Sequence, residues 1–283
     1  MSSQKITVKL PNPQGVAAGG TATFRIPVGK RIHSLQLIYN DTNQDLSDFE
    51  EIRIFANGRV VQRFSATERD ALNQFDGREA AAGILTLPFD RTGMITLPGR
   101  ENTAINTGVA DENGTKISSM YMEIDIASGA TIAEADLKLY SLQSDAVSGG
   151  PGTIPFITRE QRQVSGADSD FQIADLINPG VNSPDKVALN RITFVPSAGS
   201  INNLKIDRNQ YNIFDRTDAL NRRFQTDGIR VPQSGYYMID PTERGISGEV
   251  VNLMGMTDFR YRLDCSTGMQ ITCLSEYLGV LTA

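Results

Sequence analysis

Hydrophobic and polar residues alternate along most of this chain with a period of two. Such alternation places every second side chain on one face, which is typical of a β-strand with one buried face. It is clearest in residues 21–28, 35–39, 52–55, 120–126, 137–140, 189–195, 204–206, 259–263 and 269–274. Turn-forming pairs such as Asn57-Gly58 and Asp76-Gly77 separate these stretches. Many short strands joined by frequent turns predict β-sandwiches or barrels.

Two segments, one in each half of the chain, follow a helical period instead. Residues 66–75 and 215–224 each place three apolar side chains on one helical face. We expect Thr67 to cap the first helix, and the glycine of an Asp-Gly pair to end each helix in a left-handed conformation. We also expect Leu72 and Leu220 to lie in the core, so that alanine at either position would cost about 2–5 kcal/mol.

Four short stretches of the first half recur in the same order in the second half. Residues 70–73 and 218–221 both read Asp-Ala-Leu-Asn, 148 positions apart (218 − 70). The other paired stretches are 52–54 with 204–206, 83–87 with 235–239, and 124–129 with 263–268. A repeat about as long as a whole domain indicates two copies of one fold in tandem.

The two copies are expected to meet at the glycine-rich segment 148–153, which has the composition of a flexible linker. We therefore place the N-terminal domain at residues 1–148 and the C-terminal domain at residues 149–283. Two stacked sheets of about eight strands, with one helix in a connection, make a jelly roll. The predicted fold class is all-β: a double jelly roll of two tandem eight-stranded β-sandwiches with one short helix per domain.

Composition and charge narrow the possible functions. The chain has 283 residues, of which 40% are hydrophobic and 21% charged, as in ordinary soluble globular proteins. It has no apolar run near the roughly 18 residues of a membrane span, and its first residues lack the apolar stretch of a secretory signal. We therefore expect it to fold in a cytoplasm. The net charge is −6 without any basic block, which argues against direct nucleic-acid binding.

Candidate catalytic groups are scarce. The single histidine is His33, whereas metal-dependent jelly-roll enzymes use several imidazoles on one metal. A Ser-His-Asp triad needs a serine beside the histidine, and the Gly-x-Ser-x-Gly motif is absent. We interpret His33 as a surface or strand-end residue. No spacing singles out a pair of carboxylates for glycoside hydrolysis. The sequence predicts no catalytic residue and no enzyme.

The best metal candidate is the acidic segment 41–50. Oxygen ligands at alternate positions, as in Asp41 and Asp45, suit a hard cation such as calcium. Leu46, however, stands where an EF-hand loop has glycine, and Ile52 stands where it has a bidentate glutamate. We interpret the segment as a solvated acidic loop, with calcium binding as the alternative, and predict neither a metal site nor a cofactor.

The two cysteines, Cys265 and Cys273, fall in one predicted hairpin. With its turn at residues 266–269, Cys265 would face Gln270 rather than Cys273, which disfavours a disulfide. We expect two half-buried, unpaired thiols.

Three segments carry a family resemblance. Residues 16–29 begin Val-Ala-Ala-Gly and end Ile-Pro-Val-Gly, residues 52–59 lead into the first helix, and residues 276–280 read Glu-Tyr-Leu-Gly-Val. In this order, and with the duplication, the chain resembles the major coat protein of corticoviruses and related tailless, membrane-containing icosahedral bacteriophages. The resemblance spans nearly the whole chain, but the segments 41–50 and 99–116 do not match.

The resemblance implies a viral structural protein that trimerises into pseudo-hexagonal capsomers. These would tile an icosahedral shell over an internal lipid membrane, in contact with neighbouring capsomers, minor capsid proteins and vertex proteins. The implied location is the virion capsid, after assembly in the host cytoplasm.

Three alternatives are open. A tandem jelly-roll module could bind carbohydrate or a receptor, although the chain has no tryptophan and its best aromatic platform is Tyr236-Tyr237. Amidases acting on glycoproteins are also built from two jelly rolls, but they are secreted. A minor vertex protein of the same virus type usually needs only a single jelly roll.

Overall fold

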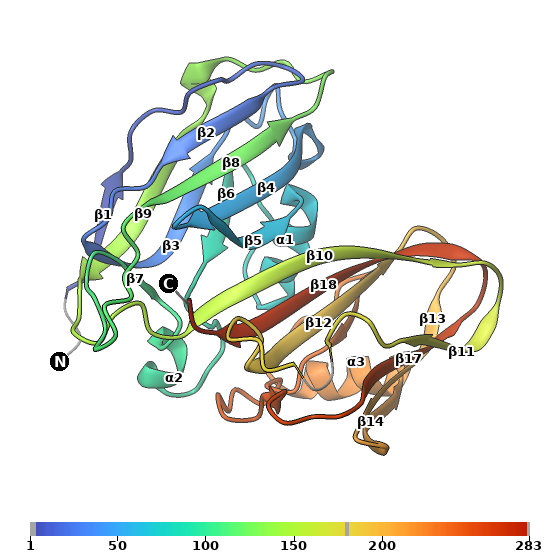
Figure 1. The fold of residues 1–283 in the computed structure, drawn as a ribbon. Helices are drawn as coiled ribbons and strands as arrows, with labels where there is room; N and C mark the ends of the chain where they lie inside the picture. The colour runs from blue at the N-terminus through green and yellow to red at the C-terminus, as the bar shows by residue number, and fades with distance from the viewer. Residues whose placement is uncertain (1–3, 179–180, 282–283) are drawn as a thin grey trace.

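The computed structural model describes residues 4–178 and 181–281, which form two β-sandwiches side by side (Figure 1). The first sandwich has one sheet in the order β1-β9-β3-β6, with the short strand β7 beside β3, and a second in the order β2-β8-β4-β5. The bounds are β1 Ile6–Lys9, β2 Thr21–Arg25, β3 Lys30–Ile38, β4 Phe49–Ala56, β5 Arg59–Phe64, β6 Ile84–Pro88, β7 Ile105–Asn106, β8 Met120–Ile126 and β9 Lys138–Asp145.

The second sandwich repeats this plan. One sheet runs β10-β18-β12-β15, with the short strand β16 beside β12, and the other runs β11-β17-β13-β14. The bounds are β10 Ile154–Val164, β11 Asp168–Ile173, β12 Ala188–Pro196, β13 Ile201–Arg208, β14 Tyr211–Thr217, β15 Tyr237–Ile239, β16 Val251–Asn252, β17 Phe259–Cys265 and β18 Met269–Gly279. The double jelly roll is therefore confirmed.

The duplication extends to single irregularities of the backbone. A register shift lies between Phe49 and Glu51 where β4 pairs with β8, and another between Ile201 and Asn203 where β13 pairs with β17. The two shifts are 152 positions apart (201 − 49), which is also the offset between the repeated stretches at 52–54 and 204–206. Because a β-bulge locally bends and twists a strand, its repetition means that both sheets share one detailed shape.

Both predicted helices are present, the first with the predicted bounds and the second shifted along the chain. Helix α1 covers Ala66–Phe75, but Ser65 caps it through a capping box with Glu68, so the expectation of Thr67 was wrong. Helix α3 covers Asp218–Asp227, three residues later than expected, with Thr217 as its cap.

The chain also departs from the expected helix count and from one expected helix end. Gly77 has the expected left-handed φ of 79°, whereas Gly228 has a φ of −94°. The N-terminal domain also holds a second helix, α2 (Leu97–Glu101), in addition to the one expected per domain.

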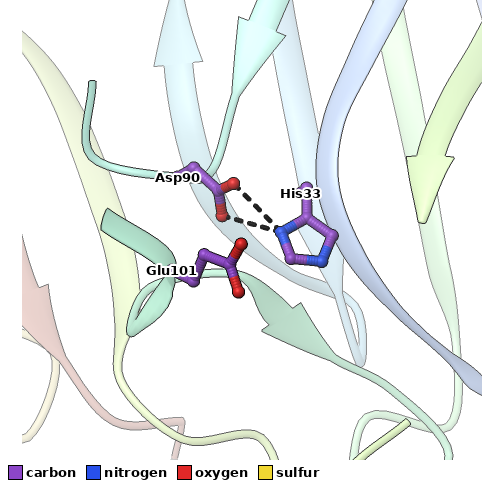
Figure 2. A group of neighbouring side chains, drawn as sticks. All are labelled: His33, Asp90 and Glu101. Carbon is purple, nitrogen blue, oxygen red and sulfur yellow. Dashed lines mark hydrogen bonds and ion pairs between the residues drawn. The ribbon is translucent and has the colours of Figure 1, made fainter. Parts of the chain in front are cut away.

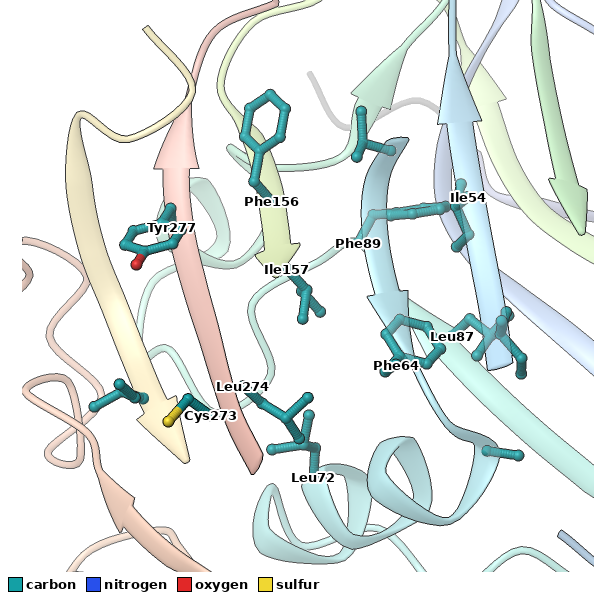
Figure 3. Packing of buried hydrophobic residues seen from close by; sticks show 14 of the residues in the cluster. Ile54, Phe64, Leu72, Leu87, Phe89, Phe156, Ile157, Cys273, Leu274 and Tyr277 are labelled. Atoms are coloured by element: carbon teal, nitrogen blue, oxygen red, sulfur yellow. The ribbon is translucent and has the colours of Figure 1, made fainter. Parts of the chain in front are cut away.

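The hydrophobic core lies between the sheets of each sandwich and continues across the seam between them. Strand β8 shows the underlying pattern, because its residues alternate between buried and half-buried positions. At the seam, β5 pairs in parallel with β10 at Gln62 and Ile157, joining two sheets into one of nine strands. Figure 3 shows apolar side chains of α1, β5, β10 and β18 in this shared core. The two sandwiches therefore form one packed body.

The domain boundary at residue 148 stays a prediction. It falls between β9, which ends at Asp145, and β10, which begins at Ile154.

Candidate assembly surfaces and buried polar clusters

Helix α1 lies against the C-terminal domain, to which it is tied by charged contacts. Glu68, in its first turn, accepts a 2.9 Å hydrogen bond from Arg159 of β10. At the other end, the ring of Phe75 lies 5.2 Å from the guanidinium of Arg191 and 5.7 Å from that of Arg230. Phe75 is fully buried, so this end of the helix is enclosed by the neighbouring domain.

A buried charge network continues from the end of α1. Arg191 of β12 donates hydrogen bonds to Asp76 at 2.8 Å and to Glu276 of β18 at 2.7 Å. Arg230 binds the same Asp76 at 2.8 Å and also Asp240 at 2.7 Å. Asp76 thus receives two guanidinium groups from the other domain, and removing either would leave its carboxylate poorly paired away from water.

Burial and neighbouring charges shift the pKa values of groups in and beside this network. Burial alone would raise the pKa of Asp76, but Arg191 and Arg230 hold this pKa below its ordinary value. Nearby Arg69 is 3% exposed, and burial lowers the pKa of its guanidinium to about 10, so it stays protonated at neutral pH. A cavity of about 40 Å³ lies among these groups. Its size suits an ordered water rather than an organic ligand.

Helix α3 occupies in the C-terminal domain the place that α1 occupies in the N-terminal domain. Asn73 of α1 donates to the carbonyl of Thr86 in β6 at 2.8 Å, and Asn221 of α3 donates to the carbonyl of Met238 in β15 at 2.6 Å. Strands β6 and β15 are equivalent in their sheets, so these hydrogen bonds are copies of one contact.

The outward face of α3 is uncovered. Leu220 is 46% exposed and Phe224 is 41% exposed, although Leu72, the equivalent of Leu220, is fully buried. The placement of Leu220 in the core was therefore wrong. The residues that face inward are instead Asn221 and Gln225, which both donate to the carbonyl of Met238.

An arginine organises the exposed face between α3 and the edge strand β14. The guanidinium of Arg216 lies 4.7 Å from the ring of Phe214 and 4.4 Å from that of Phe224. Glu243 fixes it with a 2.9 Å ion pair. Burial raises the pKa of Glu243, against the opposing effect of Arg216. Phe224 is exposed and Phe214 is half-buried, and aromatic residues around a fixed arginine are enriched at the centres of protein–protein interfaces.

His33 lies in a buried polar cluster between β3, β9 and the segment before α2 (Figure 2). Its Nδ1 is 3.0 Å from Asp90, as Figure 2 shows by dashed lines. Its Nε2 is 2.9 Å from the hydroxyl of Ser144. His33 is 1% exposed, so the expectation of a surface or strand-end residue was wrong. A bulge in β3, between Ile32 and Ser34, places it there.

The order of Ser144, His33 and Asp90 resembles a catalytic triad, a grouping that sequence spacing did not indicate. Ser144 is only 5% exposed and lies within β9, so its hydroxyl does not face solvent. The cluster of His33, Asp90 and Glu101 also has the composition of a metal site. The Lys5 ammonium lies against it, 3.2 Å from Asp90 and 2.8 Å from Glu101, and supplies the positive charge that these carboxylates attract. The cluster therefore fits a structural role.

In the acidic segment 41–50, carboxylates accept hydrogen bonds from backbone amides of the same segment. Asp45 accepts a 2.6 Å hydrogen bond from the amide of Ser47, and Asp48 accepts one from the amide of Asp45 at 2.9 Å. These bonds close one turn of 3-10 helix over Leu46–Asp48. Asp41 and Asp45 are exposed, as in a solvated loop.

The two cysteines do not share a hairpin, contrary to the sequence-based expectation. Cys265 ends β17 and Cys273 lies in β18, and these strands belong to different sheets. Both thiols are free and buried. Burial raises the pKa of Cys265 to about 11 and that of Cys273 to about 12, so neither is a reactive thiolate at neutral pH.

Several solved viral capsid proteins share this architecture. The major capsid protein P2 of bacteriophage PM2 matches with a TM-score of 0.84 and 19% identity, covering 99% of this chain and 98% of that one. A chain of Sulfolobus Turreted Icosahedral Virus matches with a TM-score of 0.66 and 11% identity (97% and 91% covered). The Faustovirus major capsid protein matches with a TM-score of 0.58 and 9% identity (100% and 91% covered). The fold is that of the double jelly-roll capsid proteins.

Family models make the assignment specific. The viral coat protein P2 N-terminal domain matches residues 7–147, and the viral coat protein P2 C-terminal domain matches residues 154–281. The chain therefore belongs to the viral coat protein P2 family and is a major capsid protein by family. A comparison with curated proteins found no match. Within the described residues, no helix has the length and apolar character needed to cross a membrane.

Proposed function

We propose that three copies of this chain form a capsomer whose six similar domains make a pseudo-hexagonal block. The observation that carries the proposal is the repeated topology: both sandwiches have the same strand order. A trimer of such chains presents six comparable walls, which allows one subunit to pack in several lattice environments.

The solution mass of the purified chain tests this proposal. Light scattering on a sizing column should give a species near three times 30.9 kDa. A monomer at all concentrations up to those used for assembly would contradict it, because a capsomer must exist before or during shell assembly.

We further propose that these capsomers tile an icosahedral shell over an internal lipid membrane. The partners would be neighbouring capsomers, minor capsid and vertex proteins, and the membrane, without direct contact to nucleic acid. The net charge of −6 supports the last point. Electron microscopy of particles containing the chain would test the arrangement, since a shell lattice without an underlying bilayer would contradict the membrane part alone.

We also propose that the protein has a structural role and is not an enzyme. The residues that come nearest to a catalytic group are His33, Asp90 and Ser144. Alanine at Ser144 should leave particle assembly intact, and loss of assembly by a folded Ser144→Ala protein would contradict this proposal. The carbohydrate- or receptor-binding alternative is not favoured by the family match.

A further inference from the structure

The seam between the two domains is a template for a contact between chains. On the N-terminal side the seam is made by the edge strand β5 and the helix α1 that follows it. On the C-terminal side it is made by the edge strand β10, which pairs with β5 in parallel. One face of a jelly roll, here called the helix face, thus receives the edge strand of the next jelly roll.

Both halves of this template recur elsewhere in the molecule, where the described residues leave them exposed. By position in the sheets, β14 and α3 repeat β5 and α1, while β1 repeats β10. Strands β1 and β14 are the outer strands of their sheets, and they lie at opposite ends of the molecule (Figure 1). Both carry exposed apolar residues, with Ile6 44% exposed in β1 and Tyr211 76% exposed in β14.

An outer strand with free backbone groups and apolar side chains pairs readily with another strand. The C-terminal helix face supplies more apolar surface beside that edge, through Leu220 and Phe224. Leu72, at the position equivalent to Leu220, is buried within the chain. The repeat therefore indicates that the occupant of the exposed face is an N-terminal domain of this same sequence.

We propose that β1 of one chain docks in parallel against β14 and α3 of a second copy, repeating the contact of β10 with β5 and α1. The inference rests on the trimer proposed above and specifies its contact. Because the two surfaces differ, the contact is head to tail and closes into a ring when three chains complete the turn.

The internal repeat also gives the register. In the seam, Ile157 of β10 lies opposite Gln62 of β5. Ile157 pairs with Glu276, which pairs with Arg191 just after the bulge in β12. In the N-terminal domain the same relation links Thr7 to Leu142 and Leu142 to Ser34, just after the bulge in β3. Thr7 is therefore the equivalent of Ile157.

The partner of Thr7 follows in the same way. Gln62 pairs with Ile54 at a bulge in β5, because the next pair is Phe55 with Val60. Phe214 pairs with Ile206 at a bulge in β14, because the next pair is Asp207 with Asn212. Phe214 is therefore the equivalent of Gln62. The proposed contact places Thr7 of one chain opposite Phe214 of the next.

A disulfide cross-link tests this register. The double variant Thr7→Cys and Phe214→Cys, oxidised with diamide, should give covalent dimers and trimers on a non-reducing gel, with nothing larger. The native cysteines are buried and serve as an unreactive background.

The matched control for the cross-link is Thr7→Cys with Tyr211→Cys. Position 211 lies three residues along the same strand, roughly 10 Å away, which is beyond the reach of a disulfide. This pair should stay uncrosslinked. Multimers larger than trimers would overturn the closed ring, and equal cross-linking by both pairs would overturn the register.

A second variant tests the helix face. Leu220→Asp should raise the concentration needed for half-maximal trimer formation by at least about tenfold, because it places a charge in an apolar contact. Its thermal unfolding as a monomer should be nearly unchanged, since Leu220 is already 46% exposed. The control is Ile84→Asp, at a 51% exposed residue of β6 outside the proposed contact, which should leave trimer formation unchanged.

The outcomes separate the two proposals. A wild-type trimer with no 7–214 cross-link and no effect of Leu220→Asp would overturn this contact and leave the capsomer standing. A wild type that remains monomeric would overturn both.

Discussion

Leu72 and Leu220 occupy the same position in two copies of one helix, yet Leu72 is fully buried and Leu220 is 46% exposed. Their inward neighbours behave alike, because Asn73 and Asn221 make the same hydrogen bond to an equivalent strand. The difference therefore lies outside the domain. Helix α1 faces a second jelly roll of its own chain, whereas the described residues leave the outward face of α3 exposed.

The two helix faces also differ in chemistry. Asp76, just after α1, is held by Arg191 and Arg230 of the neighbouring domain. At the equivalent distance along α3 stands Phe224, 148 positions later (224 − 76), beside Arg216. A contact made once, during folding of one chain, thus uses buried charges. The face of α3, which we propose is covered by a second chain, instead carries an apolar surface, and this surface does not have the desolvation cost of unpaired charges.

The largest expected effect comes from breaking the charged seam. Arg191→Ala removes the partner shared by Asp76 and Glu276 and leaves two buried carboxylates poorly paired. We expect a loss of about 3–5 kcal/mol in the free energy of unfolding, measured by chemical denaturation. Arg25→Ala on β2, at an exposed residue away from the seam, is the control and should change stability little. An ordinary hydrogen bond contributes about 1 kcal/mol to stability. A loss of less than about 1 kcal/mol for Arg191→Ala would therefore contradict the proposed role of the network.

The next largest effect tests the difference in burial between Leu72 and Leu220. Leu72→Ala should cost about 2–5 kcal/mol of unfolding free energy, because it opens a cavity in the core. Leu220→Ala should cost less than about 1 kcal/mol in the monomer, since the side chain is already half in water. Equal costs measured on monomers would show that α3 is covered within its own chain.

How much of this was visible in the sequence depends on how many faces an element buries. Strand β8 buries one face and follows the alternation, so its bounds were predicted as found. Strand β10 lies between β18 and β5 inside the nine-stranded sheet, and its mixed burial left no clear period in residues 154–163. Local sequence patterns reflect the local environment of a strand, whereas part of the environment of β10 comes from β5 of the other domain.

The polar clusters escaped prediction for the same reason. His33 and its partners Asp90 and Ser144 come from three distant segments, and no motif spacing connects them. Leu220 was misplaced because an apolar residue on a helical face indicates burial without saying which chain provides it. The internal repeat was the one long-range signal in the sequence, and it predicted the fold class correctly.

Removing the asparagine hydrogen bond of α1 or of α3 should destabilise the protein by a smaller amount, equal in the two domains. Asn73→Ala and Asn221→Ala each remove a donor to the carbonyl of an equivalent strand, at Thr86 and Met238. We expect about 1–2 kcal/mol for each in denaturation experiments. A clear inequality would mean that the two hydrogen bonds, although equivalent in position, are not equivalent in energy, which would weaken the use of one domain as a template for the other.

The smallest effect is a pH dependence confined to acid, and it should belong to the α1 seam alone. The pKa of Asp76 is lower in the folded chain than its ordinary value near 3.9, despite the opposing effect of burial, because Arg191 and Arg230 stabilise the carboxylate. A lowered pKa contributes stability that is complete above the unfolded-state value and is lost as the pH falls through the folded-state value. The melting temperature of the wild type should therefore decrease as the pH is lowered below about 4. The melting temperature of Asp76→Asn should be lower throughout that range but should depend less on pH. Phe224 does not titrate, so Phe224→Leu should keep the wild-type slope, and a wild-type slope in Asp76→Asn would assign the acid sensitivity to other carboxylates.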